Sequence, residues 1–260
     1  MHGSHPKIIP ADTLLLAYRS GIFPMADSRD DPDVFWVEPR LRAIMPLDGF
    51  HCSRSLAKLI RQDRFRVTVN HAFDEVLAAC AAPRAGRPES WISERIAASY
   101  RVLHLAGHAH SVECWHAGDD GNWTLAGGLY GVSFDRVFCG ESMFSRTRDA
   151  SKVALAWLVV LMRRAGAELL DCQFLTEHLA SLGAVEISQQ HYLELLAKAV
   201  RKGPEADLPA AYAGLLAEAA GVGAGEDAAA EGALAGLPLA AGSGSSSPGK
   251  LIAQSLTHTS

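Results

Sequence analysis

The chain has 260 residues, of which 48% are hydrophobic and 20% charged. This balance is typical of a soluble globular protein with one large or two modest domains. A formal net charge of −5 gives no general attraction to nucleic acid, so such binding would need a local basic patch. The longest apolar stretch, residues 153–162, is too short to cross a bilayer, and five cysteines without a C-x-x-C pair argue against a zinc ribbon or a disulfide framework.

The N-terminal part of the chain combines short helices with a proline-rich segment. A helix is predicted at 11–20, and prolines at 24, 39 and 46 among aromatic residues indicate a small, irregular N-terminal domain over residues 1–50. Apolar spacing then predicts a helix at 53–62, an alternating strand at 65–70, and helices at 72–83 and 90–107. Ser53 or Ser55 would cap the first of these helices, and Ser90 or Ser93 the last.

Strands dominate the middle of the chain, and the composition changes near its end. Strands are predicted at 110–117 and 123–144, on either side of the turn signal "DDGN". A helix at 150–166, a strand at 168–174 and a helix at 189–201 follow. This order predicts an α+β domain over residues 51–202 with a largely antiparallel sheet. Residues 203–260 are rich in Ala, Gly and Ser and are predicted to form a mostly disordered, low-complexity tail, in which alanine-rich pieces such as "AGLLAEAA" could form a transient helix.

The stretch "ELLDCQFL" places a carboxylate and an amide inside an apolar run. In a strand, Asp171 and Gln173 would point to one face, while Leu170, Cys172 and Phe174 would point to the other. A buried ionised carboxylate without partners is costly. The pair is therefore either a hydrogen-bonded part of the core or the lining of a site, and the pattern alone does not favour one over the other.

The stretch "FCGESMFSRTRDASK" leads from a predicted strand into a predicted helix. Glu141 lies among apolar residues, and Arg146, Arg148 and Lys152 bring positive charge to the start of the helix. A helix N-terminus with such residues suits an anion, for example a nucleic-acid phosphate, although a solvated charged loop is the more common explanation of such a pattern. The chain lacks a P-loop, a G-x-G-x-x-G fingerprint and a G-x-S-x-G elbow.

Histidines and tryptophans offer further candidates for a site. His104, His108 and His110 lack a nearby carboxylate or cysteine, so we do not expect a metal site there. Trp36, in a proline-rich loop, and Trp91, at a helix start, could each stack on a base, although each is more often a cover for a small core. Trp157 and Phe138 have the pattern of buried residues that could line an apolar pocket.

The chain resembles the leucyl/phenylalanyl-tRNA–protein transferase family over about residues 11–200. The resemblance rests on six strings in the same order: "YRSGIFPM", "SWISERIAASYRVLHLAGHAHSVECW", "GGLYGVSF", "FCGESMFSRTRDASK", "LLDCQF" and "HLASLGAVEI". It implies a small N-terminal domain followed by a GNAT-like acyltransferase domain, in a cytoplasmic bacterial enzyme without metal or acetyl-CoA. The implied reaction moves Leu or Phe from aminoacyl-tRNA to the N-terminal Arg or Lys of a protein, which marks that protein for proteolysis.

The resemblance also implies roles for individual residues. Asp171 and Gln173 would be the catalytic pair, and Arg146, Arg148 and Lys152 would contact tRNA phosphates. The aminoacyl end of the tRNA would be bound by Glu141, by Trp36 and Trp91 at the terminal adenosine, and by Leu129, Phe138, Leu155 and Trp157 around the amino-acid side chain. Trp157 stands where the family commonly has a smaller aromatic residue, and Leu129 where it commonly has methionine. We therefore hypothesise a preference for Leu over Phe.

Two other functions remain compatible with the sequence. A GNAT-like domain without catalysis could bind tRNA ends or peptides, although Asp171 and Gln173 argue for an enzyme. An acyl-CoA N-acyltransferase would carry a glycine-rich loop for the pyrophosphate, whereas residues 145–151 read "SRTRDAS" and contain no glycine.

Overall fold

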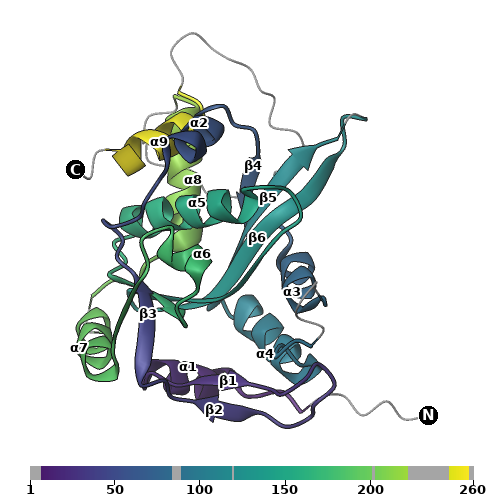
Figure 1. The fold of residues 1–260 in the computed structure, drawn as a ribbon, viewed down its shortest axis with the longest axis vertical. Helices are drawn as coiled ribbons and strands as arrows, with labels where there is room; N and C mark the ends of the chain where they lie inside the picture. Colours follow the sequence, from purple (N-terminus) through teal and green to yellow (C-terminus); the bar gives the residue numbers. More distant parts are fainter. Residues whose placement is uncertain (1–6, 84–88, 119, 201–202, 222–245, 258–260) are drawn as a thin grey trace.

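A seven-stranded sheet forms the centre of the protein (Figure 1). The structure, a computed structural model, describes residues 7–83, 89–118, 120–200, 203–221 and 246–257. The strand order is β4-β5-β6-β7-β8-β3-β9, and only β7 and β8 are parallel among these described strands. The α+β class predicted from the sequence is confirmed, and the GNAT-like topology stays a prediction. The strands are β3 (Leu41–Met45), β4 (Arg66–Val69), β5 (Ala109–Ala117), β6 (Trp123–Phe134), β7 (Val137–Ser145), β8 (Leu169–Gln173) and β9 (Val185–Ser188).

The N-terminal residues form a small unit beside the main sheet, at the bottom of Figure 1. Helix α1 (Ala11–Arg19) is followed by a two-stranded sheet of β1 (Phe23–Met25) and β2 (Phe35–Val37), which the sequence analysis did not predict. Gly21 ends the α1 turn with a φ of +78°, a conformation that favours glycine. Strand β3 follows in the chain and already belongs to the main sheet. The division of the chain after residue 50 stays a prediction.

Helices cover both faces of the main sheet. Helix α5 (Ala150–Arg164) packs on β5, β6 and β7, and it is buried almost all round. Helices α3 (Phe73–Ala81) and α4 (Glu94–Leu105) pack against β5 and β6 within a second cluster of buried side chains, on the other side of the sheet in Figure 1. The remaining helices of this part are α2 (Arg54–Arg61), α6 (Glu177–Ala180) and α7 (Gln189–Ala199).

Several predicted element boundaries need correction. The run of strands predicted over 123–144 consists of β6 and β7, which a turn through Asp135, with a φ of +51°, separates. Of the two serines proposed as the cap of each helix, one takes that role: the Ser53 hydroxyl accepts a hydrogen bond from Leu56 N, and the Ser93 hydroxyl accepts one from Ile96 N.

No helix in the described ranges is long and apolar enough to cross a membrane.

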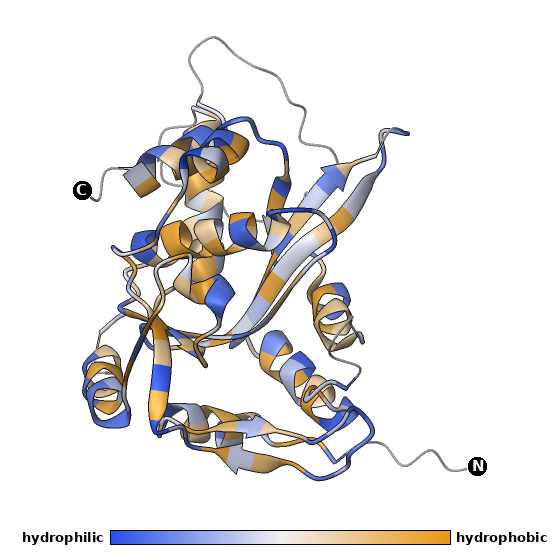
Figure 2. Ribbon diagram, in the orientation of Figure 1, coloured by the Kyte–Doolittle hydropathy of each residue, from blue (hydrophilic) through white to orange (hydrophobic). Residues whose placement is uncertain are grey.

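The predicted disordered tail is wrong for two segments. Helices α8 (Leu208–Ala219) and α9 (Pro248–Thr257) pack on α5, and Figure 2 shows hydrophobic residues along this region. Leu215 and Ile252 are fully buried within the same cluster as α5. A low-complexity composition hides this docking because small Ala side chains allow close helix packing without a strong apolar period. Residues 222–245 of the predicted tail lie outside the described residues.

Candidate active site

A cavity of about 590 Å³ opens where β7 and β8 stop pairing. The parallel register ends at Cys139↔Asp171, after which β7 continues along β6 and β8 along β3. The residues just beyond that point line the cavity: Gly140, Glu141, Ser142 and Met143 from one strand, and Cys172, Gln173 and Phe174 from the other and its end. The cavity is therefore built by the divergence of two neighbouring strands.

Glu141 enters this cavity from a β-bulge. Tyr130 pairs with Ser142 and Gly131 with Gly140, which leaves Glu141 as the extra residue of β7. A bulge bends its strand and redirects the side chain. Gly131 is suited to this close approach, because a Cβ there would collide with the Cys139 carbonyl and the Phe138 ring.

Three side-chain donors hold the Glu141 carboxylate. Its Oε1 accepts from the Tyr18 hydroxyl at 2.8 Å and from Gln173 Nε2 at 3.0 Å, and its Oε2 accepts from the Tyr100 hydroxyl at 2.9 Å. Burial raises the pKa of Glu141 to about 7, although these three hydrogen bonds act in the opposite direction. Glu141 is 7% exposed and lines the cavity, so it is a carboxylate that a substrate can reach.

Asp171 lies behind this wall and is fully buried. Arg42 on β3 binds it with two bonds, Nε to Oδ1 at 2.9 Å and Nη2 to Oδ2 at 2.6 Å. The Tyr192 hydroxyl donates to Oδ2 at 2.9 Å, and the backbone N of Gln173 donates to Oδ1 at 2.8 Å. Both carboxylate oxygens are thus engaged, and Asp171 is not among the residues that line the cavity.

Gln173 joins Asp171 to Glu141. It ends β8 with a φ of +62°, a conformation that is uncommon for a non-glycine residue, and the bond from its N–H to Asp171 holds it there. The pairing of β3 with β8 also shifts here, because Ala43 pairs with Gln173 whereas the next residue, Ile44, pairs with Asp171. The side chain of Gln173 then reaches Glu141, and the chain of contacts runs from Arg42 through Asp171 and Gln173 to Glu141.

Four members of this network were not predicted from the sequence: Tyr18, Arg42, Tyr100 and Tyr192. Arg42 offered a signal, because it is a charge within the apolar strand "LRAIM" and a buried Asp171 required a cation or several donors. The three tyrosines offered none, since a tyrosine in a helix with apolar neighbours has the pattern of an ordinary core residue.

The opposite wall of the cavity is apolar. Leu129 and Leu155, two residues predicted to surround the amino-acid side chain, line it together with Met143, Leu158, Leu170 and Leu179. Phe138 and Trp157 are buried but do not line it. Trp157 is two positions from Leu155, so it points to another side of α5, where its ring lies 6.3 Å from that of Tyr212. The location of Trp157 therefore gives no support to the hypothesis of a preference for Leu.

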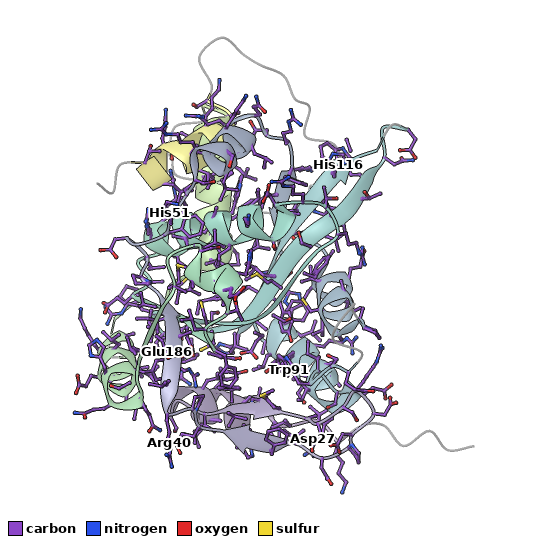
Figure 3. All side chains as sticks on the ribbon, viewed as in Figure 1. Asp27, Arg40, His51, Trp91, His116 and Glu186 are labelled. Atoms are coloured by element: carbon purple, nitrogen blue, oxygen red, sulfur yellow. The ribbon has the colours of Figure 1, made fainter. Side chains whose placement is uncertain are left out.

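Aromatic side chains line one end of the cavity. They are Trp91, labelled in Figure 3, and Phe35 of β2, and Met25 of β1 also belongs to the lining. Trp36 does not line the cavity and is 44% exposed. Successive residues of a strand point to opposite faces. Phe35 therefore faces the cavity, and Trp36 faces away from it.

The predicted basic residues lie at the start of α5. Arg148 is 95% exposed, and Arg146 donates to the Leu125 carbonyl at 3.2 Å. Lys152 Nζ lies 2.8 Å from Asp149 Oδ1, which offsets part of the positive charge. Burial and the nearby Lys152 lower the pKa of His178, a residue of the cavity wall, so this basic cluster adjoins the cavity.

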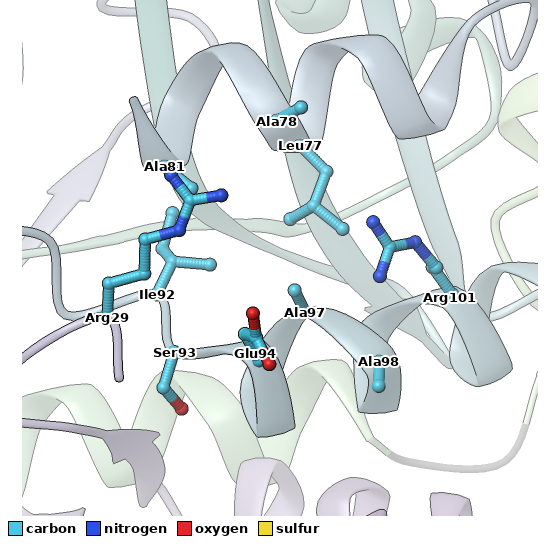
Figure 4. A pocket seen from close by; sticks show the side chains of 10 residues that line it. All are labelled: Arg29, Leu77, Ala78, Ala81, Ile92, Ser93, Glu94, Ala97, Ala98 and Arg101. Carbon is cyan, nitrogen blue, oxygen red and sulfur yellow. The ribbon is translucent and has the colours of Figure 1, made fainter. Parts of the chain in front are cut away.

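Two of the three candidate histidines, His104 and His110, have hydrogen-bond partners outside this cavity. The His104 Nδ1 contacts the Ala109 carbonyl at 2.8 Å, and that of His110 contacts Asn70 at 2.9 Å. The described residues contain no cluster of three or more His, Cys, Asp or Glu side chains that could hold a metal ion. A second cavity, of about 230 Å³, lies between α3 and α4, and its lining combines alkyl side chains with the polar residues Ser93, Glu94, Arg29 and Arg101 (Figure 4). Because Arg101 pairs with Asp74 at 2.6 Å, we assign no chemistry to this cavity.

Comparisons with known proteins match the sequence of this chain to one family. Residues 44–197 match the family described as "Leucyl/phenylalanyl-tRNA protein transferase", and residues 9–40 match its N-terminal domain. A protein of that name from Novosphingobium aromaticivorans is 63% identical over 265 residues, covering 98% of each chain. Its namesake from Rhizorhabdus wittichii is 58% identical over 73% of this chain and 75% of its own, and that from Zymomonas mobilis is 54% identical over 75% and 70%.

These matches span the N-terminal unit, the sheet and both strands that line the cavity. The family's members are aminoacyl-transferring acyltransferases that work with aminoacyl-tRNA and protein substrates. The chain, with its cavity between diverging β7 and β8, belongs to the leucyl/phenylalanyl-tRNA–protein transferase family.

Proposed function

We propose that this protein transfers leucine or phenylalanine from aminoacyl-tRNA to the N-terminal Arg or Lys of a protein. The observation that carries the proposal is the Glu141–Gln173 pair, joined at 3.0 Å on one wall of a cavity whose other wall is apolar. A carboxylate beside an apolar pocket suits an amino acid, which has an α-amino group and a hydrocarbon side chain. The product carries a new N-terminal residue, which marks the protein for regulated proteolysis.

The aminoacyl end of the tRNA fits the cavity in one orientation. The amino-acid side chain lies against Leu129, Leu155 and Leu158, and its α-amino group lies at Glu141. The terminal adenosine then lies toward Trp91 and Phe35, whose rings can stack on a base. The tRNA phosphates lie near the basic cluster of Arg146, Arg148 and Lys152 and carry no sequence information.

The reaction is aminolysis of the tRNA ester. The acceptor nitrogen forms a bond to the ester carbonyl carbon, and the bond between that carbon and the ribose O3′ breaks. The nitrogen loses a proton, and O3′ gains one. The ester is already activated, so much of the rate enhancement comes from placing the two substrates in contact.

Asp171 acts in this scheme as a positioning residue. Arg42, Tyr192 and the Gln173 backbone occupy its oxygens, so it does not touch the substrates. It fixes Gln173 instead. Because the Gln173 Nε2 group donates a hydrogen bond to Glu141, the amide is oriented so that its Oε1 can accept a hydrogen bond from the attacking amine.

The apolar wall accounts for an enzyme that accepts two amino acids. Such a pocket distinguishes substrates that differ by one methylene by only about 1–3 kcal/mol. Leu and Phe both fill it with unbranched Cβ atoms, whereas shape disfavours β-branched residues. We also place the enzyme in the cytoplasm, where aminoacyl-tRNA is made.

An acyl-CoA N-acyltransferase fits the site less well. Those enzymes bind the pyrophosphate with a glycine-rich loop before the corresponding helix, whereas residues 145–151 before and at the start of α5 contain no glycine. A binding module without catalysis is favoured by no feature of the site.

Transfer of radiolabelled Leu from Leu-tRNA to a protein with N-terminal Arg tests the proposal. We expect incorporation into this acceptor and none into the same protein with its N-terminus acetylated. Equal labelling of both acceptors would place the transfer at another amine, and a well-folded enzyme that labels neither would refute the proposed function.

A further inference from the structure

Two residues of the cavity wall have a buried polar atom without a hydrogen-bond partner. Within the described part of the chain, four buried side-chain atoms have this property: Arg95 Nε, Tyr130 Oη, His178 Nε2 and Ser247 Oγ. Tyr130 and His178 both line the large cavity. Buried polar groups are nearly always paired, so a group without a partner in a cavity indicates a missing ligand.

Tyr130 is the more informative of the two because it is fully buried. It lies on β6 opposite Ser142, directly beside the bulge that carries Glu141. Edge contacts with the rings of Tyr100 at 5.6 Å and Phe73 at 5.9 Å hold its own ring. The position of the hydroxyl is therefore set by packing, and a partner must come to it.

The neighbouring tyrosines behave differently. Tyr18 and Tyr100 both donate to the Glu141 carboxylate, whereas Tyr130 does not, although Glu141 is close enough to raise its pKa after the larger effect of burial. The hydroxyl of Tyr130 thus stays protonated and uncharged, with its lone pairs available beside a carboxylate. Because Glu141 and Tyr130 belong to the lining of one cavity and to neighbouring strands, a carboxylate and a hydroxyl oxygen in this arrangement suit a ligand with several N–H donors.

We propose that the Tyr130 hydroxyl is a substrate contact that accepts, beside the Glu141 carboxylate, a hydrogen bond from the α-amino group of the aminoacyl residue. This inference rests on the proposed function, which places that amino group at Glu141. An ammonium has three N–H donors and is poorly satisfied by one carboxylate oxygen. Tyr130 supplies a second acceptor and so makes the site specific for donors whose α-amino group is free.

Two stable analogues of the tRNA end can isolate this contact. One is 3′-phenylalanylamido-adenosine, and the other is the 3-phenylpropanoyl analogue, which lacks only the α-amino group. Their dissociation constants are measured by calorimetry for the full-length wild type and for Tyr130→Phe, which keeps the ring and removes the hydroxyl. We expect the variant to bind the phenylalanyl analogue about tenfold more weakly and the phenylpropanoyl analogue as the wild type does.

Tyr212→Phe is the matched control. It also removes a tyrosine hydroxyl, which donates to the Val67 carbonyl at 2.9 Å outside the cavity, and should leave both affinities unchanged. Equal weakening of both analogues by Tyr130→Phe would show a purely structural hydroxyl, and unchanged affinities would show one that binds only water; either result overturns the contact. If the wild type binds neither analogue, the proposed function fails together with the contact, whereas wild-type binding with unchanged variant affinities refutes the contact alone.

Discussion

Asp171 and Arg42 form a two-bond ion pair across β8 and β3, with the side chain of Asp171 fully buried and that of Arg42 2% exposed. The pair lies behind the cavity wall and not in it. Asp171 also accepts hydrogen bonds from the Tyr192 hydroxyl and from the backbone N of Gln173. The second of these bonds stabilises the left-handed backbone conformation of Gln173. We therefore expect Asp171, the carboxylate of the predicted catalytic pair, to act on the substrate only through Gln173.

Replacing Asp171 with Asn should destabilise the protein. The change leaves the Arg42 guanidinium buried without a counter-charge, which costs about 3–5 kcal/mol. Urea unfolding measures this loss. Asp135→Asn is the control, since its pair with Arg19 is part-exposed and should be worth less than about 1 kcal/mol. Equal effects of the two changes would contradict the structural role of the buried pair.

Replacing Gln173 with Ala should reduce transfer with little loss of stability. The side chain makes one bond to Glu141, and its loss removes the proposed acceptor for the attacking amine. We expect kcat/KM to fall by about 100-fold, as for the misplacement of a reacting group. Gln189→Ala provides the control, because that exposed amide bonds only to Glu38 at 2.7 Å. Full activity of Gln173→Ala would remove Gln173 from the reaction.

The free energy of unfolding should decrease as pH rises, because of Glu141. Its folded-state pKa of about 7 lies above its ordinary value of 4.5, so between these values the folded state holds a proton that the unfolded state has lost. The stabilisation from this proton is complete below pH 4.5, decreases as pH rises, and is gone above pH 7. The total is on the order of 3 kcal/mol. The difference in unfolding free energy between wild type and Glu141→Gln, measured by urea from pH 4.5 to 8, isolates this effect.

A difference that stays flat over that range would show that Glu141 is ionised throughout. Activity gives a second reading of the same group. Because the ionised form binds an α-ammonium group, kcat/KM for the aminoacyl donor should rise through about pH 7 in the wild type.

Leu215→Ala should test whether the C-terminal helices dock in solution. Leu215 of α8 is fully buried in the cluster around α5, so its truncation should cost about 2–5 kcal/mol. Leu105→Ala serves as the comparison, because Leu105 is 86% exposed and its loss should change stability by less than about 0.5 kcal/mol. Thermal unfolding measures both. No change in Leu215→Ala would mean that α8 does not hold α5.

Transfer should weaken as salt concentration rises. Each phosphate contact releases counterions, so the logarithm of kcat/KM should fall linearly with the logarithm of salt concentration. Arg148→Ala, which removes a side chain that is 95% exposed, should reduce the slope by about one. Arg64→Ala, an exposed arginine far along the chain from the basic cluster, should leave the slope unchanged. A flat salt response of the wild type would contradict phosphate contacts at the start of α5.

Much of the site was predictable because it depends on local sequence. The spacing of Asp171 and Gln173 in an apolar run, and the charge of Glu141 among apolar residues, singled out three members of one network. Trp36 and Trp157 were predicted to bind the aminoacyl end of the tRNA, but neither lines the cavity, and one physical reason explains both cases. A shift of one residue in a strand or two in a helix reverses the direction of a side chain, and a list of apolar residues does not record that direction.

The amino-acid sequence by itself determined the α+β class, most of the helices and strands, and the family, since these follow from periodicity and from the order of specific strings. Only the tertiary structure decided which carboxylate faces the cavity. Arg42 lies 129 residues from Asp171 in the chain and neutralises it, whereas Glu141 is carried into the cavity by a bulge beside diverging strands. The environment of a charge is set by the segments that fold around it, and those segments come from distant parts of the chain.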